Sequence, residues 1–392
     1  MAVLPLLALL YAVIAAGCSS DEPPTPKPSS DYNSVIINAD GTATGNAVFS
    51  RIDETTFFLD YVKYKIVDSH LEVVGYDSVE LPEEPKLYAE VQIDGTVYKT
   101  RVITGFSEAR IKRITIPSTV TDLDGFSKCI LLTEINIPEG VKEFGWGCFS
   151  ECTSLTEIQI PLSVTKIGRS CFKECNALTK IEIPRGVESL GHDCFYGCTS
   201  LSMVNLPDNI AIGLRCFEHC NSLININIPR GSILSSRCFS ESSLRELNIM
   251  GEVYGEKDTT YGTYCFSKSK SLVEVDLHNG LTELGDYWFS ECTSLETIDI
   301  PDSVHKLGDG CFCECSSLKE VKLSKNLSII GDGCFLGCVN LVKITFRGNV
   351  PKCSPSAFFE VPYDAIVYVP NEYLEDYKSW YIGTRFKQII GY

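Results

Sequence analysis

Apolar residues recur along this chain at intervals of 20 to 27 residues, most often 23. Six positions after most of the recurring phenylalanines comes a leucine, and apolar residues follow three and five positions later, as in Leu155, Ile158 and Ile160. This alternation predicts a short strand with one buried face. A proline such as Pro161 then ends the strand, because it has no N–H for a further ladder. The marker phenylalanines are Phe106, Phe126, Phe149, Phe172, Phe195, Phe217, Phe239, Phe266, Phe289, Phe312, Phe335 and Phe358.

The remainder of each unit predicts how the chain returns to the next strand. A second apolar pair, Val164 and Ile167, leads to Gly168 and a turn, and we expect the phenylalanine and its flanking cysteines on a helical turn. One unit is too small to bury its own apolar stripe, so successive units must stack about 4.8 Å apart in parallel sheets. The sequence therefore predicts one solenoid of eleven or twelve coils instead of separate globular domains.

The repeated motif F-x-x-C-x-S-L, followed by I-x-I-P, is similar to a known repeat family. Its best copy runs from Cys148 to Gly168, and the pattern covers roughly residues 95–360. It resembles the BspA-type leucine-rich repeat of bacterial surface proteins, with proline where the better-known leucine-rich consensus has asparagine. The resemblance implies a leucine-rich repeat solenoid with short parallel strands and helical turns. It also implies a role in adhesion to host proteins or in contact between bacteria.

The segments on either side of the repeats are expected to cap the stack, because open sheet edges recruit other chains. We expect a small β-rich N-terminal cap over residues 32–94, the solenoid over 95–350 and a C-terminal cap over 351–392. In the second cap, a last strand at 365–369 precedes a short amphipathic helix that Asn371 can cap.

The N-terminus reads as an export signal. Residues 1–17 form a signal peptide whose apolar run is too short to span a bilayer and ends in small residues before Cys18. This arrangement resembles a bacterial lipobox, which makes Cys18 the lipid anchor and residues 18–31, rich in proline and serine, the tether. The acidic residues that follow resemble an export signal to the outer face of the outer membrane. The alternative is an ordinary cleaved secretory signal with Cys18 incidental.

The negative net charge of the chain limits the classes of partner that it can bind. The chain has 51 acidic and 34 basic side chains and a formal net charge of −17, so it repels phosphate backbones and anionic headgroups. We therefore expect no nucleic-acid partner, and membrane contact only through the lipid anchor. The sequence leaves the oligomeric state open.

Most of the 19 cysteines fall into two columns, one directly before the repeat phenylalanine and one three residues after it. Metal sites need ligands that converge on one point, whereas these cysteines recur at every coil. The pattern favours free, buried thiols over scattered disulfides, since stacked Cβ vectors run parallel. No cofactor and no metal are expected.

No residue pattern singles out a catalytic group. The nearest cluster is Cys216 with His219, which the repeat explains as an exposed histidine on a turn. Asp286, Asp309 and Asp332 follow turn glycines, where we expect them to cap the next helical turn. A cysteine-dependent enzyme stays the least favoured alternative.

The outward face of the strands is the candidate binding site. We call it the polar ribbon. Its amide and carboxylate side chains suit broad contact with an extracellular protein, or alternatively glycan capture for an outer-membrane uptake system, although a merely soluble sheet face has the same composition. A structural coat that self-associates is a further alternative. The candidate residues are Glu134, Asn136, Glu157, Gln159, Lys180, Glu182, Asn205, Asn225, Asn227, Glu246, Asn248, Glu274, Asp276 and Asp299.

One irregular coil offers a second candidate surface. The step from Phe239 to Phe266 is 27 residues long and contains three tyrosines, Tyr254, Tyr261 and Tyr264, interleaved with glycine. Insertions in repeat proteins often contribute to binding, and tyrosines supply rigid contact area. The segment predicts either an aromatic patch or a degenerate coil with packed tyrosines.

Overall fold

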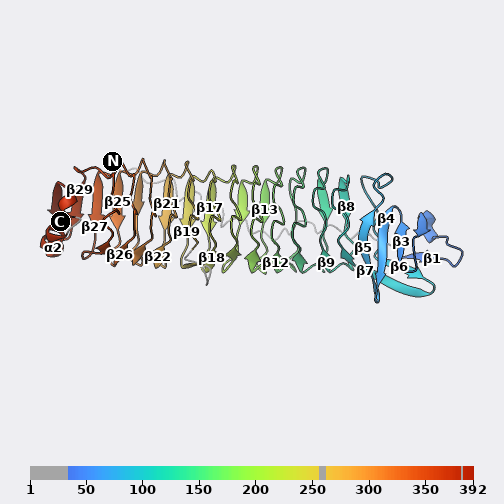
Figure 1. The fold of residues 1–392 in the computed structure, drawn as a ribbon. Helices are drawn as coiled ribbons and strands as arrows, with labels where there is room; N and C mark the ends of the chain where they lie inside the picture. Colours follow the sequence, from blue (N-terminus) through green and yellow to red (C-terminus); the bar gives the residue numbers. More distant parts are fainter. Residues whose placement is uncertain (1–33, 256–261, 381–382) are drawn as a thin grey trace, which may run out of the picture. The chain divides into compact units, whose positions relative to one another are not determined.

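The computed structural model describes residues 34–255, 262–380 and 383–392. The chain divides into two compact units, Met1–Asn33 and Ser34–Tyr392. The signal peptide, the tether and the Cys18 anchor lie outside the described residues, as does Tyr261. The second unit is a solenoid of about twelve coils, which confirms the predicted leucine-rich repeat fold (Figure 1).

The predicted L-x-x-I-x-I segments form the first column of strands, which pair in parallel with neighbouring coils in four separate groups. Residues 157–159 depart from the pattern, since they form no strand, although Ile158 and Ile160 are still buried. The strands of this column are β8 Arg113–Thr115, β10 Glu134–Asn136, β13 Lys180–Glu182, β15 Met203–Asn205, β17 Asn225–Ile228, β19 Glu246–Ile249, β21 Glu274–Leu277, β23 Thr297–Asp299, β25 Glu320–Leu323, β27 Lys343–Phe346, β29 Ile366–Val369 and β30 Gln388–Gly391.

A second column of very short strands forms where each coil turns back after its first strand. These strands also pair in parallel, and the first of them extends the sheet of the N-terminal cap. The strands are β9 Asp122–Leu123, β11 Glu143–Phe144, β12 Lys166–Ile167, β14 Ser189–Leu190, β16 Ala211–Ile212, β18 Ser232–Leu234, β20 Val253–Gly255, β22 Glu283–Leu284, β24 Lys306–Leu307, β26 Ile329–Ile330 and β28 Lys352–Cys353.

The phenylalanine segment is built from turns instead of the regular helical turn that we expected. Residues two before and two after the phenylalanine adopt left-handed backbone conformations, as in Ser170 (φ 53°) and Glu174 (φ 58°). The Phe172 N–H then donates to the Cys194 carbonyl oxygen of the next coil at 2.8 Å. Left-handed residues interrupt a helix, so alternate N–H groups here bond to the neighbouring coil and not back along their own chain.

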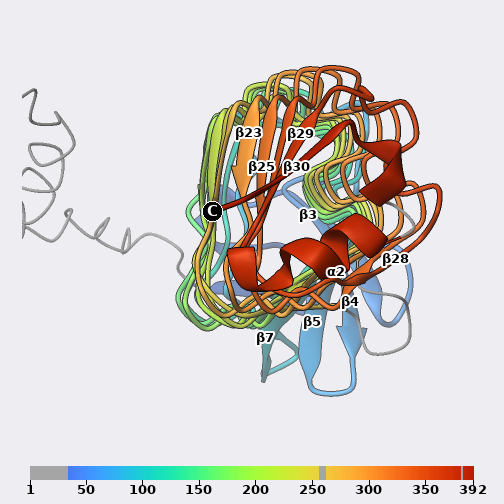
Figure 2. The same ribbon diagram turned by 90° about the vertical axis from the view of Figure 1, so that its left-hand side faces the viewer.

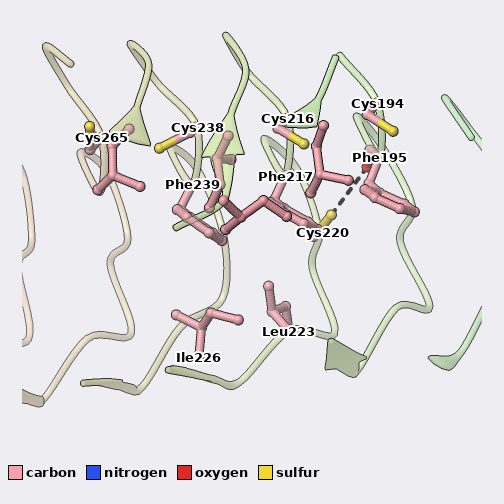
Figure 3. Close-up of a cluster of buried hydrophobic side chains, with 14 of the residues drawn as sticks. Cys194, Phe195, Cys216, Phe217, Cys220, Leu223, Ile226, Cys238, Phe239 and Cys265 are labelled. Atoms are coloured by element: carbon pink, nitrogen blue, oxygen red, sulfur yellow. Dashed lines mark hydrogen bonds between the residues drawn. The ribbon is translucent and has the colours of Figure 1, made fainter. Parts of the chain in front are cut away.

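The core is a continuous column of aromatic rings. All twelve marker phenylalanines are fully buried, and the rings of successive coils stack with centroids 5.0–5.7 Å apart. Figure 3 shows Phe195, Phe217 and Phe239 in this stack, with Cys194 and Cys216 beside it. The predicted inward-facing columns of phenylalanine and cysteine are confirmed.

A mixed sheet precedes the first coil. β2 to β5 form an antiparallel meander, β6 and β7 form a hairpin, and β7 also pairs in parallel with β5 and β9. The elements are β1 Val35–Ile37, the 3₁₀ helix η1 Thr44–Asn46, β2 Phe49–Arg51, β3 Thr56–Leu59, β4 Val62–Val67, β5 His70–Tyr76, β6 Glu90–Ile93 and β7 Thr96–Ile103.

Beyond β29 come the 3₁₀ helix η2 Asn371–Tyr373, α2 Leu374–Ser379, the 3₁₀ helix η3 Gly383–Arg385 and β30. Figure 2 shows α2 across this end of the stack. Tyr377 is fully buried and its hydroxyl donates to the carbonyl oxygen of Asn349 at 3.0 Å. Two expectations were wrong. β29 is not the last strand, because β30 pairs with it, and Asn371 begins η2 without making a side-chain cap.

Candidate functional site

The structure places the polar ribbon along the first strand column, as predicted. Its side chains are exposed, including Glu157 and Gln159, which lie in the coil without a regular strand. The exception is Asn248, which is half-buried. Alternation explains this exposure, since neighbouring strand residues such as Ile226 and Leu247 point into the core.

Because the strands are in register, the ribbon side chains form two rows along the stack. In one row Asn225 pairs with Glu246, which in turn pairs with Glu274. In the other row Asn248 pairs with Asp276. The Asn248 Oδ1 atom is buried and has no hydrogen-bond partner among the described residues. Carboxylates and amides therefore lie opposite one another on adjacent coils.

A depression of about 430 Å³ lies beside the end of β21 and β23. Leu277 and Pro301 contribute apolar lining, while Asp276 and Asp299 bring two ribbon carboxylates to it. Arg347 lies on one side, with its side chain 30% exposed. The depression thus combines some apolar lining with groups of both charges.

Arg347 holds three coils together at this depression. Its Nε donates to the carbonyl oxygen of Leu323 at 2.9 Å, and its Nη2 donates to the carbonyl oxygen of Ile300. The same Nη2 lies 3.1 Å from Asp299 Oδ1 and 3.4 Å from Asp302 Oδ1. The guanidinium therefore bonds to strand-end carbonyls and carboxylates together.

Sequence reasoning missed Arg347, although a signal was present. Most coils have proline directly after the strand, as in Pro301, whereas β27 is followed by Arg347 at the same place in the repeat. His278 occupies that place after β21. A polar residue in place of this proline therefore marks a coil whose side chain at the strand end can form hydrogen bonds or ion pairs.

Of the predicted tyrosine patch, the structure describes the ring of Tyr264. It stacks on Tyr287 of the next coil, with ring centroids 4.6 Å apart and planes within 6°, and the Arg237 guanidinium carbon lies over the Tyr264 ring, 5.4 Å from its centroid. Tyr287 was missed, although both tyrosines lie two residues before the marker phenylalanine. Tyr264 therefore packs against side chains of both neighbouring coils. Tyr261, and the side chain of Tyr254, lie outside the described part of the chain.

The described cysteines are free, and all but the half-buried Cys313 are buried. Burial raises the pKa of Cys175 and that of Cys315 to about 12. An activated nucleophile needs the opposite shift, towards the thiolate. These thiols therefore pack in the core in a protonated state.

The other candidate groups have structural partners. The Nδ1 atom of His219 lies 3.7 Å from Glu241, and the His219 ring packs edge-on against Tyr196. The partners of His219 are therefore not the cysteines. Asp286 Oδ1 accepts the N–H of Asp309 at 2.9 Å, one coil on. The aspartates therefore connect coils and do not cap helical turns, because the turns that follow them are not helical.

Among the described residues, no three or more His, Cys, Asp or Glu side chains lie together so that they could hold a metal ion. Within the same part of the chain, no helix has the length and apolar character required to cross a bilayer. The ribbon and the depression beside it are the candidate site that remains.

Comparisons with known proteins agree with the repeat pattern. A family model described as BspA type leucine rich repeat region (6 copies) matches residues 103–212, 147–259 and 253–362. No curated protein matches the chain.

Among solved structures, similar proteins come from several bacteria. A leucine-rich repeat protein from Bacteroides ovatus ATCC 8483 is 26% identical with a TM-score of 0.44, covering 74% of this chain and 94% of that one. A leucine rich cell surface protein from Faecalibacterium prausnitzii A2-165 is 22% identical with a TM-score of 0.41, covering 78% and 96%. The pneumococcal vaccine antigen PcpA is 17% identical with a TM-score of 0.44, covering 86% and 98%.

Proposed function

The chain belongs to the BspA-type leucine-rich repeat family, and we propose that it is a non-enzymatic cell-surface protein that adheres to other proteins through its polar ribbon. The observation that carries this proposal is the continuity of the ribbon. From β10 to β27, successive coils present polar side chains outward, and they do so in register within β13–β15, within β17–β19–β21 and within β23–β25–β27. Such a surface offers many hydrogen bonds over a long, open face, which suits a macromolecular partner better than an enclosed small molecule.

We propose further that the protein is displayed outside the cell on a lipid anchor at Cys18. The sequence around Cys18 supports this, since small residues precede the cysteine and a proline-rich tether follows it. A tether of that composition is solvated and semi-stiff, so it would hold the solenoid away from the membrane.

Binding by the full chain to an array of purified extracellular matrix proteins, bacterial surface proteins and polysaccharides tests the proposed adhesion. We expect a protein ligand whose binding is lost when Asn225→Arg and Asn227→Arg are combined on β17. The matched control combines Thr165→Arg and Ser189→Arg, which add the same charge beside the second strand column. Binding of polysaccharides alone, or equal loss in both variants, contradicts adhesion through the ribbon.

A further inference from the structure

The ribbon carries negative charge on β19 and β21 that no lysine or arginine of the described residues pairs with, whereas Asp299 on β23 pairs with Lys322 and Arg347. Glu246 and Glu274 are register partners on adjacent coils, and neither belongs to an ion pair within the described residues. Among the described residues, the ion-pair partner of Asp276 is the His278 imidazole, with 3.7 Å between Oδ2 and Nε2. Like charges directly opposite in a sheet repel one another and destabilise it. This segment therefore costs stability unless a cation from elsewhere approaches it.

Elsewhere the solenoid neutralises such carboxylates with a cation one coil further on. Lys319 Nζ lies 2.8 Å from Glu296 Oε1, and Lys343 Nζ lies 2.9 Å from Glu320 Oε1. Each pair is separated by 23 residues, one full coil. One coil after Glu246, the equivalent position holds Glu274. The chain therefore has an acidic residue where the two pairs above have a lysine.

Arg347 shows how this surface receives a guanidinium. It bonds to the strand-end carbonyl oxygens of Leu323 and Ile300 and pairs with Asp299. Asp276 and Asn279 line the same depression one coil further towards the N-terminus. That position offers a carboxylate and an amide beside an open space of about 430 Å³, which Arg347 borders from the coil of β27.

We propose that the segment formed by Glu246, Glu274 and Asp276 binds an extended, arginine-bearing stretch of a partner protein, with one guanidinium seated beside Asp276. This inference rests on the proposed adhesive function and names the chemistry of the partner. Guanidinium is favoured over ammonium because its planar fork can bond to a carboxylate and to neighbouring oxygens together. A single metal ion does not fit, since no three acidic, His or Cys groups of the described residues converge on one point.

The test uses the full chain and a fluorescent peptide of alternating arginine and serine, with its lysine–serine and glutamate–serine counterparts as controls. We expect the arginine peptide to bind several-fold more tightly than the lysine peptide, and the glutamate peptide not to bind. Combining Glu246→Gln, Glu274→Gln and Asp276→Asn should weaken arginine-peptide binding about ten-fold, since three charge pairs are lost. The matched control combines Asp122→Asn, Glu143→Gln and Glu188→Gln, which remove three charges near the second strand column.

A thermal melt of the same variants gives an independent readout. Removing the repulsion between Glu246 and Glu274 should leave the melting temperature of the ribbon triple variant equal to or above that of the unsubstituted chain. Equal weakening of peptide binding in both triple variants, or equal affinity for arginine and lysine peptides, overturns the inference. If a protein ligand from the array no longer binds the Asn225→Arg/Asn227→Arg variant but still binds the ribbon triple variant, adhesion through the ribbon is supported. The same result rules out the arginine-bearing partner.

Discussion

The thiol of Cys175 donates a hydrogen bond to the carbonyl oxygen of Phe149, one coil earlier, at 3.0 Å. The same oxygen accepts the backbone N–H of Cys152 at 3.2 Å. The relationship repeats along the stack, for example between Cys198 and Phe172. Cysteine in this column is therefore more than a small apolar filler, because it satisfies a second lone pair of a buried carbonyl.

Cys175→Ala should lower the free energy of unfolding by about 1–2 kcal/mol, because it removes both the thiol hydrogen bond and the packing of the sulfur atom. Urea unfolding followed by circular dichroism measures the change. Cys313→Ala is the control, since Cys313 is half-buried, and it should change stability by less than about 0.5 kcal/mol. An equal loss in both variants would show that the Cys175 bond does not stabilise the core.

Alkaline pH should destabilise the solenoid through its buried thiols. The folded pKa of Cys175 is about 12, above the value of about 8.5 for an unfolded cysteine. The unfolded chain therefore loses its thiol protons first. The stabilisation is complete below the unfolded pKa and is lost as the pH rises towards the folded pKa.

We expect the urea midpoint to fall steadily between about pH 8 and about pH 11. The Cys175→Ala variant should show a shallower fall, because it has one such thiol fewer. A midpoint that is independent of pH across this range contradicts the assignment of protonated, buried thiols.

Gly191→Ala should destabilise the stack by about 3 kcal/mol. A Cβ atom at Gly191 would lie 2.4 Å from the backbone nitrogen of Arg169 and 2.5 Å from the carbonyl carbon of Gly168. The backbones of the two coils would therefore have to separate. The matched control is Gly186→Ala, whose added Cβ meets nothing closer than 3.6 Å. Thermal melts of the two variants compare them directly, and similar melting temperatures would be the contrary result.

Arg347→Met should lower the free energy of unfolding by about 2 kcal/mol, because hydrogen bonds from a charged group to Leu323 and Ile300 are lost. Hydrogen exchange should also quicken at the Lys325 N–H, which donates to Asp302 Oδ1 at 3.0 Å. Lys352→Met, at an exposed position of β28, is the control and should leave both measurements unchanged. Unaltered exchange at Lys325 in the Arg347 variant would count against the bridge between coils.

The conformation of the phenylalanine turns and the lining of the depression depend on contacts between coils, which the sequence of a single repeat does not contain. The segment around Phe172 has the spacing of a helical turn, yet it bonds to the next coil because left-handed residues such as Glu174 redirect its N–H groups. Tyr264, which was expected in a patch with Tyr254 and Tyr261, stacks on Tyr287 of the next coil. Both outcomes depend on what the neighbouring coil presents at a distance of about 5 Å.

Periodicity by itself determined the solenoid, the inward columns of phenylalanine and cysteine and the outward ribbon, because spacing along the chain decides which side chains share a face. Tertiary structure alone decided that Arg347 reaches back over two coils to Asp299 and that Glu246 and Glu274 are register partners on adjacent coils, with no ion pair to either among the described residues. Such contacts join residues 28 to 48 positions apart, and only the stacking of whole coils sets the distance between them.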